Sequence, residues 1–480
     1  MTRRPPPRRS EVTPPVADHA PLAPPALSAA RAAASPPRLS FRTVPLPTGL
    51  IAAGSDGATA GGSQGLLELL AGREDVVSWV RHGRGLVGWG QALRLEAQGP
   101  DRIESLRSAW RATVYASWWR DALVRPGTGP VALGTIAFSP DSAAASVLIV
   151  PQVLVGLDAA GAWLTTAVPE GEAHPEVAEA LARLRPPASA RPDASSPDAP
   201  MVSPGSLSET DYLAAVAETQ RRMAAGEARK VVLARDLLVT PSATLATGDL
   251  LRHLGASYPS CWTFAVDSMV GATPELLVRL ENRHLASRVL AGTARRHAGD
   301  AAAREREAER LARWLAASAK NRAEHEFARA SAVTALEPLC SLVEAEPPRV
   351  LMLPNVLHLA TDITGVVAGD TGALSLVGAL HPTAAVCGTP SEAAARIIVE
   401  VEGMDRGRYA GPVGWVDWHG EGEWCIALRS AALPPDGLGP GAPARVFGGG
   451  GIMPESVPAD ELAETTAKMR PMLAALGVGG

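Results

Sequence analysis

Cysteine is scarce in this sequence of 480 residues, which contains only four. No two of them form a Cys-x-x-Cys pair, so their spacing argues against both a disulfide framework and a thiolate zinc site. Long apolar runs are also missing, because none reaches the ~18 residues of a membrane span. The arginines near the N-terminus are followed by prolines and not by an apolar stretch, so no secretory signal is recognised. We therefore expect a cytoplasmic protein with no membrane partner.

An excess of positive charge is absent as well. The net charge is −5, so the chain has no bulk positive field for binding nucleic acid. Hydrophobic residues make up 46% of the chain and charged residues 20%, which excludes disorder throughout. The ten histidines include no His-x-x-x-His or His-Glu-x-x-His pattern, and Gly-x-Ser-x-Gly does not occur. Neither a zinc hydrolase nor a serine hydrolase is therefore indicated.

Lysine is unusually rare for a chain with so many basic residues. Of the 45 lysines and arginines, only Lys230, Lys320 and Lys468 are lysines. An arginine cannot lose its proton, whereas a lysine can be tuned to act as a base and offers a compact charge. The three lysines are therefore candidates for chemistry, with chance retention as the alternative.

Composition divides the chain into four segments. Residues 1–40 hold ten prolines with many Ala and Arg, which predicts a disordered tail outside the fold. Residues 41–185 alternate strand-like and helix-like stretches and form the N-terminal part of a sandwich. Residues 186–204 contain six prolines and indicate a linker or surface loop. In residues 205–480 strands mostly follow strands with helices grouped between them, which predicts an α+β sandwich and not a doubly wound sheet.

Several elements of the last segment are clear enough to place. Ser208 should open a helix that runs to about residue 225, and an apolar strand should span residues 230–239. We expect one strand over residues 262–270 and a long helix over 321–343. A strand over 444–447 should lead through four glycines into a final helix over about 459–476.

The four glycines at 448–451 allow two interpretations. Without Cβ atoms their N–H groups can approach an anion closely, so they could form a backbone cradle. The run lacks the flanking residues of a P-loop or a dinucleotide fold, so a flexible turn is the simpler interpretation.

Carboxylates on the expected helices allow two interpretations too. Glu461, Glu464 and Lys468 share one helix face at i, i+3 and i+7, which is typical of a solvated face. Glu324 lies near the start of another helix, where the helix dipole favours acidic residues. Two helical glutamates far apart in sequence can also bind Mg²⁺, which takes one or two carboxylates and keeps waters and substrate oxygens.

Candidate acid and base groups come from the strands and turns. Glu275 directly follows Pro274, where burial would raise its pKa as a general acid requires. Lys230 begins an apolar strand, where desolvation favours the neutral amine that a base requires. His358 and His381 lie in an apolar strand and a turn-rich loop, and each is more often structural than catalytic in such a position.

The order of these segments resembles the chorismate-utilising enzymes of the anthranilate synthase component I type, and most closely their isochorismate synthases. The matching segments cover residues 205–480 densely and residues 85–170 weakly. They are residues 230–235, 271–275, 290–296, 322–325, 358–361, 381–390, 405–406, 409–415, 422–424, 447–452 and 461–468.

The resemblance implies the large antiparallel-sheet α/β sandwich of that family and a magnesium-dependent isomerase. Chorismate would receive water at C2 and lose its C4 hydroxyl to give isochorismate, for menaquinone or siderophore biosynthesis. By resemblance Lys230 is the base, Glu275 the acid, and Glu324 and Glu464 bind Mg²⁺. The positions that match substrate contacts are Gly292, Thr293, His358, Ala385, Tyr409, Arg429, Gly450, Gly451 and Lys468. We expect a monomer without a glutaminase partner.

Three alternatives stay open beside the isochorismate synthase. A salicylate synthase shares the lysine and also eliminates pyruvate. Anthranilate and aminodeoxychorismate synthases lack a lysine at the position of Lys230 and typically carry Thr at that of Ala385, so both residues favour water as the nucleophile. A silent homologue would be expected only if an acid, base or metal ligand were missing. The segment 318–322 and Ala384 depart from the family pattern, which puts the geometry around the reacting groups in doubt.

Overall fold

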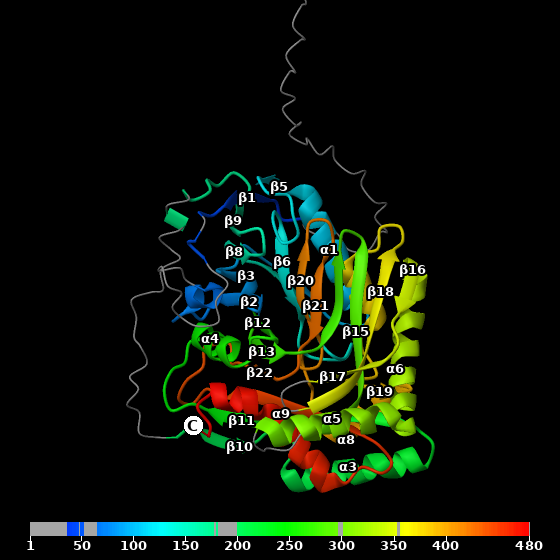
Figure 1. The fold of residues 1–480 in the computed structure, drawn as a ribbon. Coiled ribbons are helices and arrows are strands. Elements are labelled where there is room, and N and C mark those ends of the chain that lie inside the picture. Colours follow the sequence, from blue (N-terminus) through cyan, green and yellow to red (C-terminus); the bar gives the residue numbers. More distant parts are fainter. Residues whose placement is uncertain are drawn as a thin grey trace, which may run out of the picture.

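The computed structural model describes residues 36–47, 49–51, 65–176, 179–180, 199–295, 301–352 and 356–479. Within these ranges two large sheets cross at a steep angle, and helices gather at the lower end and along the right edge (Figure 1). Among the strands that the structure describes, all pairs are antiparallel except β1 with β5. The α+β sandwich expected from the sequence is therefore confirmed.

The first sheet contains thirteen strands among the described residues. Their hydrogen-bonded order is β10 (Met201–Pro204), β11 (Lys230–Thr240), β23 (Ala444–Ile452), β22 (Ser430–Ala432), β13 (Met269–Thr273), β12 (Trp262–Val266), β2 (Val76–Arg81), β3 (Arg84–Trp89), β8 (Val153–Leu157), β9 (Ala162–Pro169), β1 (Leu39–Pro45) and β5 (Trp118–Asp121), with β19 (Gly388–Thr389) beside β11.

The second sheet contains ten strands in the described part of the chain. Their order is β16 (Cys340–Ala345), β18 (Val356–Val367), β15 (His284–Arg295), β14 (Leu276–Glu281), β21 (Gly422–Ile426), β20 (Pro412–Asp417), β6 (Val131–Thr135), β7 (Ser146–Val150) and β4 (Leu93–Ala97), with β17 (Arg349–Met352) beside β18.

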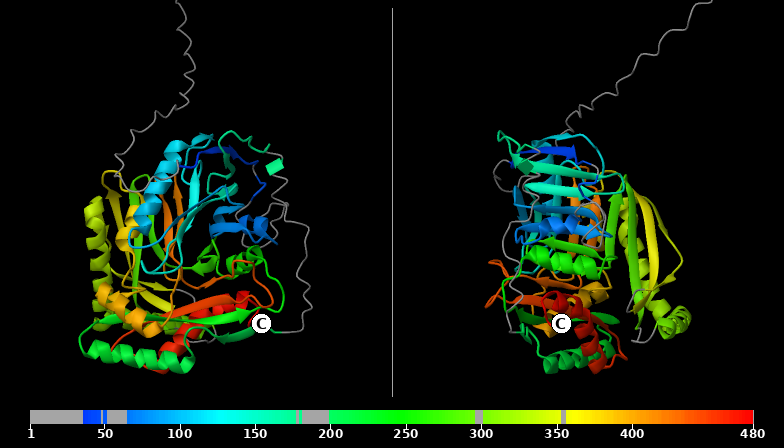
Figure 2. Two further views of the ribbon diagram at one scale, coloured as in Figure 1. Left: turned by 180° about the vertical axis from the view of Figure 1, so that it is seen from behind. Right: turned by 60° about the vertical axis from the view of Figure 1, so that its left-hand side comes forward.

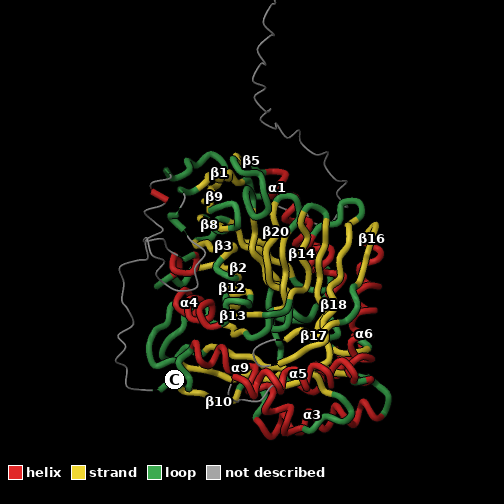
Figure 3. Tube along the Cα trace, viewed as in Figure 1, coloured by secondary structure: helices red, strands yellow, loops and turns green. Residues whose placement is uncertain are grey.

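The helices lie mostly outside the two sheets, as the tube view shows (Figure 3). Those described are η1 (Leu66–Leu70), α1 (Arg102–Ala116), α3 (Glu209–Ala224), α4 (Thr247–Ser257), α5 (Ala301–Ala317), α6 (Ala319–Leu336), η2 (Glu337–Leu339), α7 (Ala373–Leu380), α8 (Ser391–Glu402) and α9 (Pro458–Ala475). Among the described helices, none is long and apolar enough to cross a membrane.

The two halves of the chain build both sheets together. Strands β1 to β9 come from the N-terminal half of the chain, and each of them lies in a sheet that also contains strands of the C-terminal half (Figure 2). Two elements fall in segments that composition had set aside: β1 begins at Leu39, inside the expected tail, and β10 lies at the end of the expected linker. The rest of those two segments lies almost wholly outside the described residues.

The main core lies between the sheets. Trp424, Phe264 and Leu133 are fully buried there, because both sheets direct alternate apolar side chains inward. A second cluster covers the outer face of the first sheet, where Leu69 of η1 and Leu251 of α4 are fully buried.

Some expected boundaries were wrong, each for a local reason. The strand expected over residues 262–270 is a hairpin, because Asp267 and Ser268 adopt positive φ values and turn the chain between β12 and β13. The helix expected over 321–343 ends at Leu336, where a 3-10 turn that contains Pro338 leads into β16. The helix after Ser208 is correct, since the Ser208 hydroxyl accepts a hydrogen bond from the Asp211 N–H at 3.1 Å.

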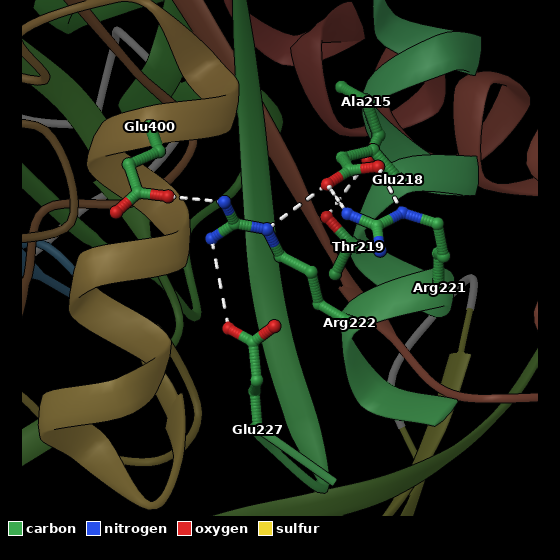
Figure 4. Close-up of polar contacts among 7 residues, drawn as sticks. All are labelled: Ala215, Glu218, Thr219, Arg221, Arg222, Glu227 and Glu400. Carbon is green, nitrogen blue, oxygen red and sulfur yellow. Dashed lines mark hydrogen bonds and ion pairs between the residues drawn. The ribbon is translucent and has the colours of Figure 1, made fainter. Parts of the chain in front are cut away.

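An ion-pair cluster connects α3 to α8 at the lower end of the molecule. Arg222 of α3 extends toward α8 and pairs with Glu400, as the close-up shows (Figure 4). The same guanidinium contacts Glu218 at 3.1 Å and lies 3.9 Å from Glu227. The cluster joins two helices that both pack on β11.

Candidate active site

The glycine run lies inside a strand, which corrects the expectation of a flexible turn. Residues 448–451 belong to β23 and pair with β11 in antiparallel register, with Gly448 opposite Arg235 and Gly451 opposite Val232. A methyl group on Gly448 would lie 2.6 Å from the carbonyl oxygen of Thr465, and one on Gly450 would lie 3.0 Å from Oε2 of Glu461. These two glycines therefore allow α9 to approach the strand closely.

The other two glycines leave room on the opposite face. A methyl group on Gly449 would lie 3.1 Å from the Tyr409 hydroxyl, and one on Gly451 would lie 3.1 Å from Cε of Lys230. Side chains at these positions would displace Tyr409 and Lys230. The missing side chains of the glycine run therefore make room for α9 on one face of β23 and for Tyr409 and Lys230 on the other.

A cavity of about 550 Å³ opens at this end of the molecule. Most of the residues proposed from the sequence line it, namely Lys230, Glu275, Gly292, His358, Ala385, Tyr409, Arg429, Gly451, Glu464 and Lys468. Gly450 is not part of the lining; a methyl group on it would point toward Glu461 of α9. The side chains of Thr293 and Glu324 lie outside the described parts of the structure.

Glu275 is a carboxyl of the cavity whose pKa is strongly shifted. It lies between β13 and β14, where its backbone oxygen accepts a hydrogen bond from the Ile426 N–H at 3.0 Å. Burial raises the pKa of its carboxyl to about 7, against the opposing pull of the positive charges of Lys468, Lys230 and Arg429. A carboxyl with such a pKa still carries a proton near neutral pH, as a general acid must.

Lys230 begins β11 and lies opposite Thr389 of β19. A methyl group on Gly451 would lie 3.7 Å from its Nζ, so the amine is close to the β23 backbone. Lys230 and Glu275 line the same cavity, and the positive charge of Lys230 opposes the rise in the pKa of Glu275. The cavity therefore brings an amine and a protonated carboxyl together.

Arg429 and Tyr409 provide donors on the same cavity. Arg429 follows β21 with a φ of 51°, and its backbone oxygen accepts from the Ala272 N–H at 3.2 Å. Tyr409 is stacked on Phe447 at 4.7 Å between ring centroids, and burial raises its pKa to about 12. A guanidinium and a protonated phenol can both hold a carboxylate.

The two histidines singled out from the sequence have different surroundings. Burial lowers the pKa of both to about 4, so both rings are neutral at pH 7. His381 bonds through Nε2 to the Phe138 carbonyl oxygen at 2.9 Å and is structural. His358 lines the cavity beside Gly292, whose φ of 76° accompanies an irregularity in the pairing of β15 with β18.

Of the two expected metal ligands, Glu464 lies on α9, whereas Glu324 lies on α6 and its side chain is outside the described parts of the structure. The Glu464 carboxylate pairs with Nζ of Lys468 at 2.7 Å, and that amine also donates to the Gly449 carbonyl oxygen at 2.8 Å. The space above Gly450 is bordered by oxygens, because a methyl group there would lie 3.0 Å from Oε2 of Glu461 and 4.0 Å from Oε1 of Glu464. Carboxylate oxygens around an open space suit a hard cation such as Mg²⁺, so these residues fit the expected ion.

A buried ion pair, Glu402 with Arg406, fills a gap in the pairing of β11. Between β19 and β10 the outer edge of β11 has no strand neighbour among the described residues. Arg406 donates there to the Val232 carbonyl oxygen at 2.7 Å, and Glu402 accepts from the Ala234 N–H at 2.7 Å. Arg406 also donates to the Val386 carbonyl oxygen at 2.9 Å, which fixes the loop that carries Ala385.

The sequence had not identified several lining residues. Arg406 lines the cavity, as do Asn321 beneath Gly292 and the residues between β23 and α9, with Ser456 among them. The Asp405-Arg406 pair had been part of the family resemblance without a role. Asn321 lies in the segment 318–322 that departs from the family pattern, but its place in the lining depends on how α6 packs against β15.

The ion pair predicts a large loss of stability when one partner is removed. Changing Arg406 to Met leaves the fully buried Glu402 charge uncompensated and should lower the free energy of unfolding by about 3–5 kcal/mol. The double variant with Glu402→Gln should recover part of this loss. Urea denaturation measures both, and a loss below about 1 kcal/mol in Arg406→Met would contradict this role.

The pKa of Glu275 predicts a pH-dependent stability cost. Because the folded pKa of about 7 exceeds the unfolded value near 4.5, stability falls as pH rises from about 4.5 through 7. Glu275→Gln removes this cost and should stabilise the protein by about 2–3 kcal/mol at pH 8 while changing little at pH 4. Thermal or urea unfolding at the two pH values tests this, and an equal effect at both would refute it.

Comparison with known proteins gives a consistent result. Residues 75–477 match the family model described as chorismate binding enzyme. A Mycobacterium tuberculosis (strain CDC 1551 / Oshkosh) protein, provisionally named isochorismate synthase MenF, is 37% identical over 375 residues, covering 74% of this chain and 89% of its own. The salicylate biosynthesis isochorismate synthase of Pseudomonas aeruginosa is 33% identical over 436 residues, covering 84% and 85%.

The fold agrees with that match. The solved structure of MenF, the menaquinone-specific isochorismate synthase of Escherichia coli, superposes with a TM-score of 0.69 over 92% of this chain and 95% of that one, at 22% identity. The family model spans most of the chain, including all the cavity-lining residues. This chain therefore belongs to the chorismate binding enzyme family.

Proposed function

We propose that this protein is an isochorismate synthase, an isomerase that adds water to C2 of chorismate and removes the C4 hydroxyl. The observation that carries the proposal is that one cavity contains both Lys230 and a carboxyl, Glu275, whose pKa burial raises to about 7. The reaction needs a base for the incoming water and an acid for the departing hydroxyl, and the two must act in the same turnover.

Each group has a defined task in this proposal. Lys230 takes a proton from the water that attacks C2, and Glu275 gives its proton to the C4 oxygen as that bond breaks. Burial of Glu275 keeps the proton available near neutral pH. One water enters at C2 and the C4 hydroxyl leaves as water, so substrate and product are isomers and no electron donor or acceptor is required.

Chorismate carries two carboxylates, and the cavity offers partners for both. Arg429, Tyr409 and the backbone of Gly450 and Gly451 would hold the enolpyruvyl carboxylate. Glu324 and Glu464 would hold Mg²⁺, which supplies positive charge for the ring carboxylate when bound. Gly292, Thr293, His358 and Lys468 complete the site in this proposal.

The second candidate is a salicylate synthase, which would eliminate pyruvate after the same first step. The relative from P. aeruginosa has salicylate biosynthesis in its name. Ala385 lines the cavity in a loop fixed by Arg406, and by resemblance an alanine at this position, where the ammonia-using enzymes typically carry Thr, favours water as the nucleophile. We infer a monomer that acts without a glutaminase, in menaquinone or siderophore biosynthesis in the cytoplasm.

Product identity tests the proposal directly. Purified protein with chorismate and Mg²⁺ should give isochorismate with pyruvate retained, and added ammonium should give no amino product. Chromatography of the products, with pyruvate measured by a coupled assay, provides the readout. Stoichiometric pyruvate with salicylate would establish the second candidate, and full turnover in excess EDTA would exclude the metal.

The role of Lys230 is tested by an arginine in its place. Lys230→Arg keeps the positive charge but cannot accept a proton, so turnover should fall about 10²–10⁴-fold while the protein remains folded. Steady-state kinetics measures the loss, and circular dichroism with chorismate binding provides the control. A variant that retains more than about a tenth of the wild-type rate would show that the base lies elsewhere, with His358 the first residue to examine.

A further inference from the structure

Tyr212 of α3 has a buried hydroxyl without a hydrogen-bond partner among the described residues. Its side chain is fully buried, so bulk solvent does not reach the hydroxyl. An unsatisfied buried hydroxyl costs about 1–3 kcal/mol, and few are tolerated in a protein. Such a group calls for a physical explanation.

The hydroxyl faces the space above Gly450. A methyl group on Gly450 would lie 4.0 Å from Oη of Tyr212, 3.0 Å from Oε2 of Glu461 and 4.0 Å from Oε1 of Glu464. One donor and two carboxylate oxygens thus border the same small volume. The volume exists because residue 450 has no side chain.

The surroundings of Tyr212 hold it in place. Arg235 lies over its ring, with the guanidinium carbon 6.0 Å from the ring centroid. The same guanidinium donates to the hydroxyls of Thr465 at 2.8 Å and Thr466 at 2.7 Å, both on α9. The ring is therefore fixed between α3 and α9. Burial raises the pKa of Tyr212 far above the physiological range, so the hydroxyl keeps its proton and can only donate to a carboxylate.

The carboxylates on α9 have other partners in the structure. Glu461 accepts from the Ser456 hydroxyl at 2.8 Å through Oε1, and Glu464 pairs with Lys468. Neither bond uses the Tyr212 hydroxyl. Carboxylates that bind a metal ion commonly accept hydrogen bonds from neighbouring side chains, which orient them toward the ion. A hydroxyl fixed beside two carboxylates can therefore orient them when they bind a cation.

We propose that Tyr212 is a positioning residue of the magnesium site, whose hydroxyl donates to the carboxylates of α9, Glu461 first, when Mg²⁺ is bound. The inference rests on the proposed function for the presence of the ion. It adds a residue of α3, outside the cavity lining, to the groups that determine metal affinity.

The test removes one oxygen atom from the full-length protein. Tyr212→Phe should weaken Mg²⁺ binding about tenfold in isothermal titration without chorismate. The same change should raise the Tm measured in EDTA by about 1–2 °C, because an unsatisfied buried hydroxyl has been removed. A purely structural residue would not show higher stability together with weaker metal binding.

Thr135 provides a matched control. Its hydroxyl is also fully buried and unpartnered among the described residues, but it lies on β6 and does not line the cavity. Thr135→Val should raise the Tm in EDTA and leave the Mg²⁺ affinity unchanged. A double variant of Tyr212→Phe with Glu461→Gln should bind Mg²⁺ as weakly as Glu461→Gln alone, because the hydroxyl acts through that carboxylate.

The outcomes separate this inference from the proposed function. Wild-type protein that binds no Mg²⁺ overturns both the metal and the role of Tyr212. Wild-type binding with equal affinity in Tyr212→Phe overturns the role of Tyr212 alone. Additive losses in the double variant overturn the action through Glu461.

Discussion

The close approach of α9 to β23 is the constraint on which the site depends. Gly448 and Gly450 allow the helix to lie directly on the strand, where a methyl group on Gly448 would lie 2.6 Å from a helix carbonyl. That contact brings Glu464 and Lys468 to the edge of the cavity. Gly449 and Gly451 keep the other face clear for Tyr409 and Lys230. A side chain at any of residues 448–451 would displace α9, Tyr409 or Lys230 from its place beside β23.

The cavity also concentrates opposing charges. Lys230, Lys468 and Arg429 all stabilise the ionised form of Glu275, and yet burial prevails and raises its pKa to about 7. Burial correspondingly lowers the pKa of Lys468. Without a substrate these desolvated charged groups lower the free energy of unfolding, as is common for groups in active sites. Two substrate carboxylates would compensate the cations.

The framework beneath the site comes from both halves of the chain. Every strand from β1 to β9 joins a sheet that also contains strands of the C-terminal half, so the catalytic groups rest on a single sandwich. Glu402 and Arg406 extend this framework to β11 by satisfying backbone groups that no strand pairs. The loop with Ala385 is fixed by the same guanidinium.

The sequence alone determined the fold class and identified the titratable groups Lys230, Glu275 and Lys468 of the cavity. The order of strands and helices predicted the sandwich, the rarity of lysine drew attention to Lys230 and Lys468, and Pro274-Glu275 indicated an acid. These signals are local, or they belong to a family pattern in linear order. The start of α3 at Ser208 was equally local, because one side chain caps the helix.

Only the tertiary structure decided the rest. The four glycines look like a turn in sequence, and their place in β23 follows from pairing with β11, more than 200 residues away. Burial sets the pKa of Glu275, and burial depends on strands from both halves of the chain. The orphaned hydroxyl of Tyr212 and the pair of Glu402 with Arg406 are visible only once α3, α8 and α9 have packed around the sheet. Local patterns specify which groups a chain contains, whereas long-range packing determines which of them meet and how strongly water is excluded.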